Sequence, residues 1–351
     1  MRLSENRAIR PVAEHSPGID GIQFLRGIAA LMVVVHHARH YFPHVESWSS
    51  FGSRGVDIFF VISGFIMAHA TQGYRSDHRL GQAGGFLLKR FVRVVPLYWL
   101  ALLWTDKRDF LHGSVTTDAL KDFVFVPHFH AVYTDAIFPS LVPGWTINYE
   151  MFFYALFAIS MLFGRRRFVV LIAAMAGLVF LGIAPWSSAA TIFYTSNVLL
   201  EFLFGIGIYF LLRYRPPSVA KPLLILITLV GFALLAIDNS DATRGYLDGP
   251  CAALIVGSTV LWAQGLKIGW LRAVGDASYS IYLFHLASFW IAGALLHRLG
   301  IEAPTALDVA LVLSSHLAIA IAAGLLVHRW VERPLLEFLR RQVEPPAASS
   351  R

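Results

Sequence analysis

The chain has 351 residues, of which 56% are hydrophobic and only 15% charged, and its mean hydropathy is +0.60. This composition excludes an ordinary soluble domain of the same length, because about a quarter of the residues in such domains are charged. The formal net charge of +7 does not indicate a nucleic-acid partner, since the basic residues are scattered between apolar segments and form no long tract.

Apolar segments of membrane-spanning length recur along the chain from residue 21 onward. A helix that crosses the hydrocarbon core of a bilayer needs roughly 20 mostly apolar residues. Ten windows meet or approach that length: 21–39, 52–70, 86–104, 145–163, 168–186, 193–212, 222–237, 247–264, 278–297 and 307–328. The sequence therefore predicts an all-α fold, a polytopic membrane bundle of about ten transmembrane helices.

Basic residues fall mainly in alternate segments between these windows, for example in the run 165–167 and near the C-terminal end of the chain. Because Lys and Arg are retained in cytoplasmic loops, this alternation predicts that both termini lie in the cytoplasm. We expect cytoplasmic tails at 1–20 and 331–351 around one transmembrane domain at 21–330. Residues 1–20 contain no apolar core, so we expect no cleavable signal peptide there.

The first apolar segment contains two ionisable residues, Arg26 and His37, eleven positions apart. Eleven steps of about 100° end about 20° from three full turns, so both residues share one helix stripe and lie about 16 Å apart. In an outward-running helix, Arg26 lies in the inner half and His37 in the outer half. A charge at that depth costs at least about 2.5 kcal/mol, so each group requires a partner, water or a function. Polar packing satisfied by neighbouring helices is the alternative.

Two carboxylates are predicted at the depth of His37. Asp57 lies in the outer part of the second segment, and Glu150 lies just below Trp145 at the outer end of the fourth. A carboxylate beside a histidine orients the ring and supports its protonated form, as a general base requires. We expect His37, Asp57 and Glu150 to be the catalytic residues, although both carboxylates could instead be structural counter-ions, for example of Arg54.

A basic cluster is predicted at the opposite, inner end. Arg90 and Arg93 lie in the cytoplasmic part of the third segment, close to the expected level of Arg26. Guanidinium groups bind phosphate oxygens strongly, so this cluster would hold a phosphorylated ligand. The positive-inside rule alone also explains Arg90 and Arg93.

Four further residues are candidates for substrate contacts. Tyr282 and His285 lie together in one segment, where they would contact the apolar part of that phosphorylated ligand or only hydrogen-bond within the bundle. Trp145 and Glu201 are expected near an outer acceptor site, although Glu201 could simply pair locally. We expect no metal site, because the histidines at 36, 37, 40 and 44 have no accompanying Cys or fixed carboxylate. Gly205 and Gly207 are expected to permit close contact between helices.

Several short motifs occur in a characteristic order along almost the whole chain: GIQFLRGIAALMVVVHHA, GVDIFFVISGF, the pair Arg90 and Arg93 with Pro96, WTINYEMFFY, FLFGIGIYFL, ASYSIYLFH and VERPL. In this order and content the chain resembles the acyltransferase-3 family of membrane acyltransferases, and most closely its exopolysaccharide O-acetyltransferase branch. The first motif is fairly specific, because it combines an Arg and a His eleven positions apart in an otherwise apolar helix. The others are individually weak.

The resemblance implies acyl-CoA as the donor and a carbohydrate hydroxyl as the acceptor, with no permanently bound cofactor. It assigns the family's Arg and His of the first helix to Arg26 and His37, and its basic pair to Arg90 and Arg93. His36 occupies a position where relatives often have another residue type, so the choice between His36 and His37 stays open, and spacing favours His37. The expected partners are a polysaccharide or lipid-linked glycan, membrane lipid and polysaccharide biosynthesis machinery.

The expected reaction is transfer of an acetyl or short acyl group across a bacterial-type inner membrane to a cell-surface or exported polysaccharide, or to its lipid-linked precursor. A secondary transporter is the main alternative, because intramembrane His, Asp, Glu and Arg can also form a proton or substrate pathway. A non-catalytic subunit of a polysaccharide export system is the third. The acceptor sugar, its hydroxyl position, the acyl length and the oligomeric state are not specified by the sequence.

Overall fold

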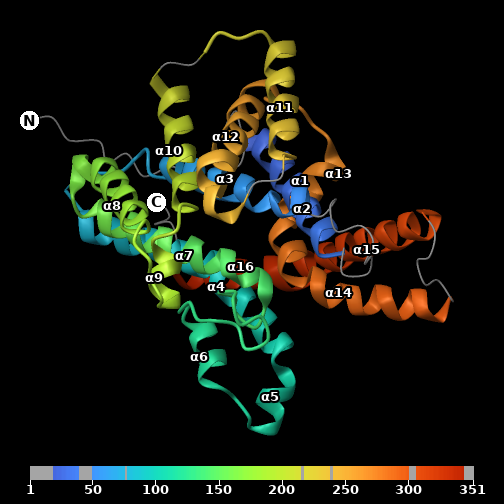
Figure 1. The fold of residues 1–351 in the computed structure, drawn as a ribbon. Coiled ribbons are helices and arrows are strands. Elements are labelled where there is room, and N and C mark those ends of the chain that lie inside the picture. Colours follow the sequence, from blue (N-terminus) through green and yellow to red (C-terminus); the bar gives the residue numbers. More distant parts are fainter. Residues whose placement is uncertain are drawn as a thin grey trace, which may run out of the picture.

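The computed structural model describes residues 19–38, 50–75, 77–214, 217–237, 240–299 and 306–343, and every regular element in these ranges is a helix (Figure 1). The longer helices are α1 (Ile19–Ala38), α3 (Gly55–Ala70), α4 (Arg79–Thr105), α7 (Trp145–Met161), α8 (Arg167–Leu181), α10 (Leu199–Tyr214), α11 (Lys221–Leu235), α12 (Arg244–Trp262), α14 (Ser278–Arg298), α15 (Ala306–Val327) and α16 (Arg333–Val343). Each of the ten predicted windows coincides with one of the first ten, which confirms the all-α prediction.

Short helices connect the long ones. They are α2 (Ser50–Ser53), α5 (Lys107–His112), α6 (Thr117–Phe123), α9 (Ala189–Tyr194) and α13 (Gly269–Asp276), together with single turns η3 (Val142–Gly144), η4 (Gly164–Arg166), η5 (Asp241–Thr243) and η6 (His328–Glu332). Helices α5 and α6 project away from the bundle (Figure 1). They belong to the segment 106–144, called here the outer loop because the predicted topology puts it on the outer side.

Five helical stretches of the described residues are long and apolar enough to cross a membrane: Asp20–Ala38, Phe51–Ala70, Ala189–Tyr214, Ser278–Arg298 and Val309–Val343. Helices α7 and α8 have 17 and 15 residues, or about 25 and 22 Å, which is less than the roughly 30 Å of a hydrocarbon core. Helix α4 is long enough, but its first half carries several basic residues. The count of ten crossings and the cytoplasmic termini therefore stay predictions.

Helix α1 lies at the centre of the bundle. It contacts α2, α3, α12, α13, α14 and α15, so its side chains are enclosed on several sides by other helices. Its residues Leu25, Ala29, Val33 and Ala38 are all buried. This position explains how ionisable side chains on α1 can be retained in an apolar chain, because they face other helices and not lipid.

Helices α3 and α10 cross at a pair of glycines. A Cβ atom at Gly64 would lie 2.0 Å from the carbonyl oxygen of Phe202, and one at Gly205 would lie 2.0 Å from that of Val61. Only glycine permits this approach of the two backbones. The prediction of close contact is confirmed for Gly205 but is wrong for Gly207, where an added Cβ would meet no atom within 4 Å.

Candidate active site

A cavity lies among α1, α3, α4, α7 and α14, and its lining combines apolar side chains with polar and charged ones. Three guanidinium groups from two helices line it, those of Arg26, Arg90 and Arg93, together with the carboxyl group of Glu150. Arg90 and Arg93 are three positions apart in α4, a spacing that puts both on one face of a helix. The structure thus brings Arg26 together with the basic pair, as the charge pattern predicts.

The three arginines differ in their surroundings. The Arg26 guanidinium donates to Gln23 Oε1 at 3.3 Å, within its own helix. Arg90 lies over the Phe86 ring at 5.8 Å, and its buried Nε has no hydrogen-bond partner among the described residues. Arg93 forms an ion pair with Glu332. Arg93 is therefore fixed by a carboxylate, whereas Arg26 and Arg90 retain N–H groups that could bind an anion.

Glu332 reaches the bundle interior because the helix is distorted at this point. The turn η6 is a π-helix in which the Arg333 N–H donates to the carbonyl of His328, five residues earlier. Pro334 follows directly and has no N–H with which to close an ordinary turn. The Glu332 carboxylate is 1% exposed and also accepts hydrogen bonds from Ser280 Oγ at 2.7 Å and His328 Nδ1 at 2.8 Å.

Glu150 lies on the arginine side of the site. Its Oε1 accepts hydrogen bonds from Ser63 Oγ at 3.0 Å and from the Tyr154 hydroxyl. Because Glu332 is matched by Arg93, the described lining holds two further guanidinium groups against the one carboxylate of Glu150. The cavity is thus a positively charged, largely apolar chamber that suits a ligand with an anionic end and an apolar arm.

Tyr282 of α14 also lines the cavity. Its hydroxyl donates to the Pro143 carbonyl at 2.9 Å and lies 2.8 Å from the Thr146 hydroxyl. The Tyr282 and His285 rings have centroids 6.2 Å apart, one helical turn along α14. His285 therefore lies behind the tyrosine that lines the cavity.

His37 meets His285 at the far end of α1. The Nδ1 of His37 lies 3.2 Å from His285 Nε2 and 3.0 Å from the Val33 carbonyl oxygen. The two rings have centroids 4.8 Å apart, and His36 packs edge-on against His37 at 5.0 Å. His37 is thus hydrogen-bonded across to α14.

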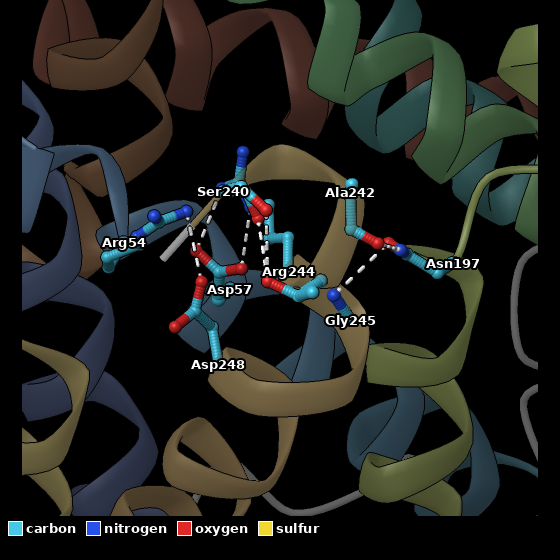
Figure 2. A network of polar contacts seen from close by, with 9 residues as sticks. Arg54, Asp57, Asn197, Ser240, Ala242, Arg244, Gly245 and Asp248 are labelled. Carbon is cyan, nitrogen blue, oxygen red and sulfur yellow. Dashed lines mark hydrogen bonds and ion pairs between the residues drawn. The ribbon is translucent and has the colours of Figure 1, made fainter. Parts of the chain in front are cut away.

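Asp57 lies in a different polar cluster, at the N-terminal ends of α3 and α12 (Figure 2). Its two carboxylate oxygens accept a bidentate pair of bonds from Arg244 Nε and an Arg244 terminal nitrogen, both at 2.8 Å. Arg54 forms an ion pair with Asp248 in the same cluster, with one terminal nitrogen 3.0 Å from a carboxylate oxygen. Neither Asp57 nor Glu150 has a described contact with His37, so the structure does not assemble the three residues at one point.

Trp145 and Glu201 border this second cluster. The Trp145 ring lies 5.3 Å from the Arg244 guanidinium carbon. Glu201, at the start of α10, is fully buried, and neither carboxyl oxygen accepts a hydrogen bond from the described residues. Asn197 ties the same region together, because it donates to the Ala242 carbonyl at 2.6 Å and accepts from the Gly245 N–H at 3.1 Å (Figure 2).

Sequence reasoning missed several residues that the structure places at the cavity or behind it: Ser63, Tyr154, Ser280 and Glu332. A usable signal existed for Glu332, since an acidic residue directly before Arg333 and Pro334 ends an apolar helix. Nothing in the local pattern marks Ser63, a small hydroxyl residue in an apolar segment. In the described part of the chain no three His, Cys, Asp or Glu residues are grouped to hold a metal ion; His40 and His44 lie outside that part.

Comparison with known proteins identifies the family. The acyltransferase domain family known as acyltransferase-3 matches residues 19–327. The chain is 36% identical to the "Exopolysaccharide production protein ExoZ" of Rhizobium meliloti (strain 1021), over 81% of this chain and 90% of that protein. It is 26% identical to the "Putative membrane-bound transacylase BcsY" of Komagataeibacter xylinus, over 95% of this chain and 86% of that protein.

A more distant relative is the "Putative O-acetyltransferase SAS0844" of Staphylococcus aureus (strain MSSA476), which is 25% identical over 78% of this chain and half of its own length. No solved structure matches the chain. A match over 19–327 includes α1 with Arg26 and His37, the basic pair of α4 and the His285 helix. The chain belongs to the acyltransferase-3 family of membrane acyltransferases.

Proposed function

We propose that this protein is a membrane O-acyltransferase that transfers an acetyl or short acyl group from acyl-CoA to a hydroxyl of an exported or cell-surface polysaccharide or its lipid-linked precursor. The observation that carries the proposal is the cavity lined by Arg26, Arg90, Arg93 and Tyr282, with His285 one turn beyond Tyr282 on α14 and His37 hydrogen-bonded to His285. The names of the exopolysaccharide and O-acetyltransferase relatives support the acceptor and the acyl group.

The donor end of the reaction follows from charge. Acyl-CoA carries phosphates at one end of a flexible arm and a thioester at the other. Guanidinium groups bind phosphate oxygens in bidentate fashion, and Arg26 and Arg90 retain N–H groups for that purpose. With the phosphates at the inner arginines, the arm would extend through the apolar cavity toward Tyr282, and no coenzyme A would need to cross the membrane.

The acceptor end requires a base. A sugar hydroxyl does not attack a thioester efficiently until its proton is removed, and an imidazole performs this near neutral pH. His37 lies at the outer end of α1 in the predicted topology, where an exported glycan would arrive. The hydroxyl oxygen forms a bond to the thioester carbonyl carbon, the carbon–sulfur bond breaks, and the hydroxyl proton passes through His37 to the departing thiolate.

The remaining assigned residues have roles suited to their positions. Glu150 would fix the inner geometry of the cavity through Ser63 and Tyr154. Asp57 would act from the second cluster, where it fixes Arg244 beneath Trp145, and Trp145 with Glu201 would border the acceptor entrance.

The test is acyl transfer by purified protein in lipid, supplied with acetyl-CoA and with surface polysaccharide isolated from cells that lack the protein. We expect release of free coenzyme A thiol only when the polysaccharide is present, and an acetyl mass increment on the polysaccharide. Uptake of a substrate into vesicles without any thiol release would contradict the proposal and favour a transporter.

Arg26→Ala and Arg90→Ala should each raise the KM for acetyl-CoA by about tenfold or more, since a charge-assisted contact contributes about 1.5–3 kcal/mol. The matched control is Arg165→Ala, which removes the same charge from an exposed position outside the cavity lining. Equal effects of all three substitutions would show that net charge matters and that the cavity arginines do not bind the donor.

A further inference from the structure

The protonation of His285 follows from its neighbours. The side chain is wholly buried in the middle of α14, and its Nδ1 lies 2.7 Å from the carbonyl oxygen of Tyr282. A carbonyl oxygen only accepts hydrogen bonds, so Nδ1 carries the hydrogen. Burial disfavours a charged ring, and the aromatic groups against it, Tyr282 and Phe289, bring no negative charge. His285 is therefore neutral, with its lone pair on Nε2.

The same reasoning fixes the tautomer of His37. Its Nδ1 lies 3.0 Å from the Val33 carbonyl oxygen and 3.2 Å from the Nε2 lone pair of His285. Both neighbours are acceptors, so the hydrogen of His37 is on Nδ1 and is shared between them. The lone pair of His37 is consequently on Nε2, on the side of the ring away from His285.

We propose that His285 is a positioning residue that holds His37 in the one tautomer in which Nε2 is the base. The proposal rests on the proposed function, in which His37 removes the proton from the acceptor hydroxyl. It gives His285 a role different from acyl-chain binding, and it rests on the described contacts of His37 with a neutral imidazole and a backbone carbonyl.

The pair also stabilises the charged intermediate. When Nε2 of His37 takes the hydroxyl proton, the ring becomes an imidazolium, and its Nδ1–H becomes a stronger donor to His285 Nε2 and the Val33 carbonyl. The proton then leaves from the same Nε2 to the thiolate, so the hydrogen on Nδ1 never moves.

The experiment compares two substitutions at the same position. His285→Gln retains an acceptor, because the glutamine amide oxygen can occupy the place of Nε2, whereas His285→Phe keeps the ring but has no acceptor. We expect His285→Phe to lower kcat by about 10- to 100-fold with little change in the KM for acetyl-CoA, since a hydrogen bond to a charged group is lost. His285→Gln should recover most of that loss.

The pH profile separates positioning from packing. The titratable groups with described ring contacts to His37 include His36 on the same helix and His285 on α14. Loss of the His285 acceptor makes the His37 imidazolium less stable, so the acidic limb of the kcat profile should move to lower pH in His285→Phe and stay in place in His285→Gln. Equal losses in both variants with an unmoved profile would overturn the proposal, as would full activity in His285→Phe.

His37→Ala separates the proposed role of His37 as the base from the proposed role of His285 in positioning it. If His37→Ala is inactive while His285→Phe is fully active, the positioning role is wrong and His37 can still be the base. If His37→Ala transfers acetyl at the normal rate, the proposed function of His37 fails and the role of His285 fails with it.

Discussion

The Asp57–Arg244 pair offers the sharpest test of how the second cluster holds the bundle together (Figure 2). Asp57→Asn keeps the shape of the side chain but removes the carboxylate charge from a group that is 0% exposed. The Arg244 guanidinium, 8% exposed, then remains buried without that carboxylate. Breaking a buried pair in this way costs about 3–5 kcal/mol, because the remaining charge is poorly solvated.

That cost converts into a change in melting temperature. At about 2.1 cal/mol/K per residue, the unfolding entropy of the 351-residue chain is about 0.7 kcal/mol/K, so Asp57→Asn should lower Tm by about 4–7 °C. Thermal melting in lipid nanodiscs, followed by the fluorescence of the nine tryptophans, measures this shift.

Glu201→Gln is the matched control. The cluster contains two guanidinium groups, of Arg54 and Arg244, and three carboxyl groups, of Asp57, Asp248 and Glu201, which lie within electrostatic reach of one another. No described donor bonds to either oxygen of Glu201, so the neutral, protonated acid is the form that fits, and with it the charges of these five described groups balance. Replacing a neutral acid with a neutral amide should change Tm by less than about 2 °C. If Glu201→Gln lowered Tm as much as Asp57→Asn does, Glu201 would not be protonated. If Asp57→Asn left Tm unchanged, the ion pair would not stabilise the packing of α12 against α3.

Three further predictions address the outer loop, the helix crossing and the end of the cavity. Burial raises the pKa of Asp122 to about 6, so the folded outer loop gains stability as pH falls through 6 toward 4 and loses it above 6. Hydrogen exchange of the α6 amides should therefore slow between pH 8 and 5 by more than the intrinsic pH effect. Asp122→Asn should abolish this additional slowing. Gly205→Ala should sharply reduce the yield of folded protein in size-exclusion chromatography, because the added Cβ would lie 2.0 Å from a carbonyl oxygen. Gly207→Ala should be tolerated, since an added Cβ there meets no atom within 4 Å. Equal yields of the two variants would contradict the close crossing of α3 and α10. Tyr282→Phe removes the hydroxyl that donates to Pro143 and should lower Tm by about 1–2 °C, and an unchanged Tm would show that this bond contributes nothing.

The sequence by itself was enough to predict a membrane environment and a helical secondary structure. Long apolar segments cannot leave backbone groups unpaired in lipid, so they must be helices, and all ten predicted windows coincide with helices in the structure. The stripe of Arg26 and His37 is also local information, because 3.6 residues per turn fixes their relative direction. The basic pair of α4 was predictable for the same reason, since a spacing of three residues puts both side chains on one face.

Tertiary structure alone decided which ionisable groups meet. The position of each residue along its helix predicted that Asp57, Glu150 and His37 lie at one depth. The rotation of each helix about its own axis decides which way the side chain points. Asp57 thus contacts Arg244, Glu150 contacts Ser63, and His37 contacts His285. That rotation depends on how neighbouring helices pack, for example on the close crossing of α3 and α10 at Gly64 and Gly205. The partner of Arg93 is Glu332, 239 positions away, and it enters the bundle through a π-turn. Contacts of such separation depend on the whole assembled bundle, so no local pattern specifies them.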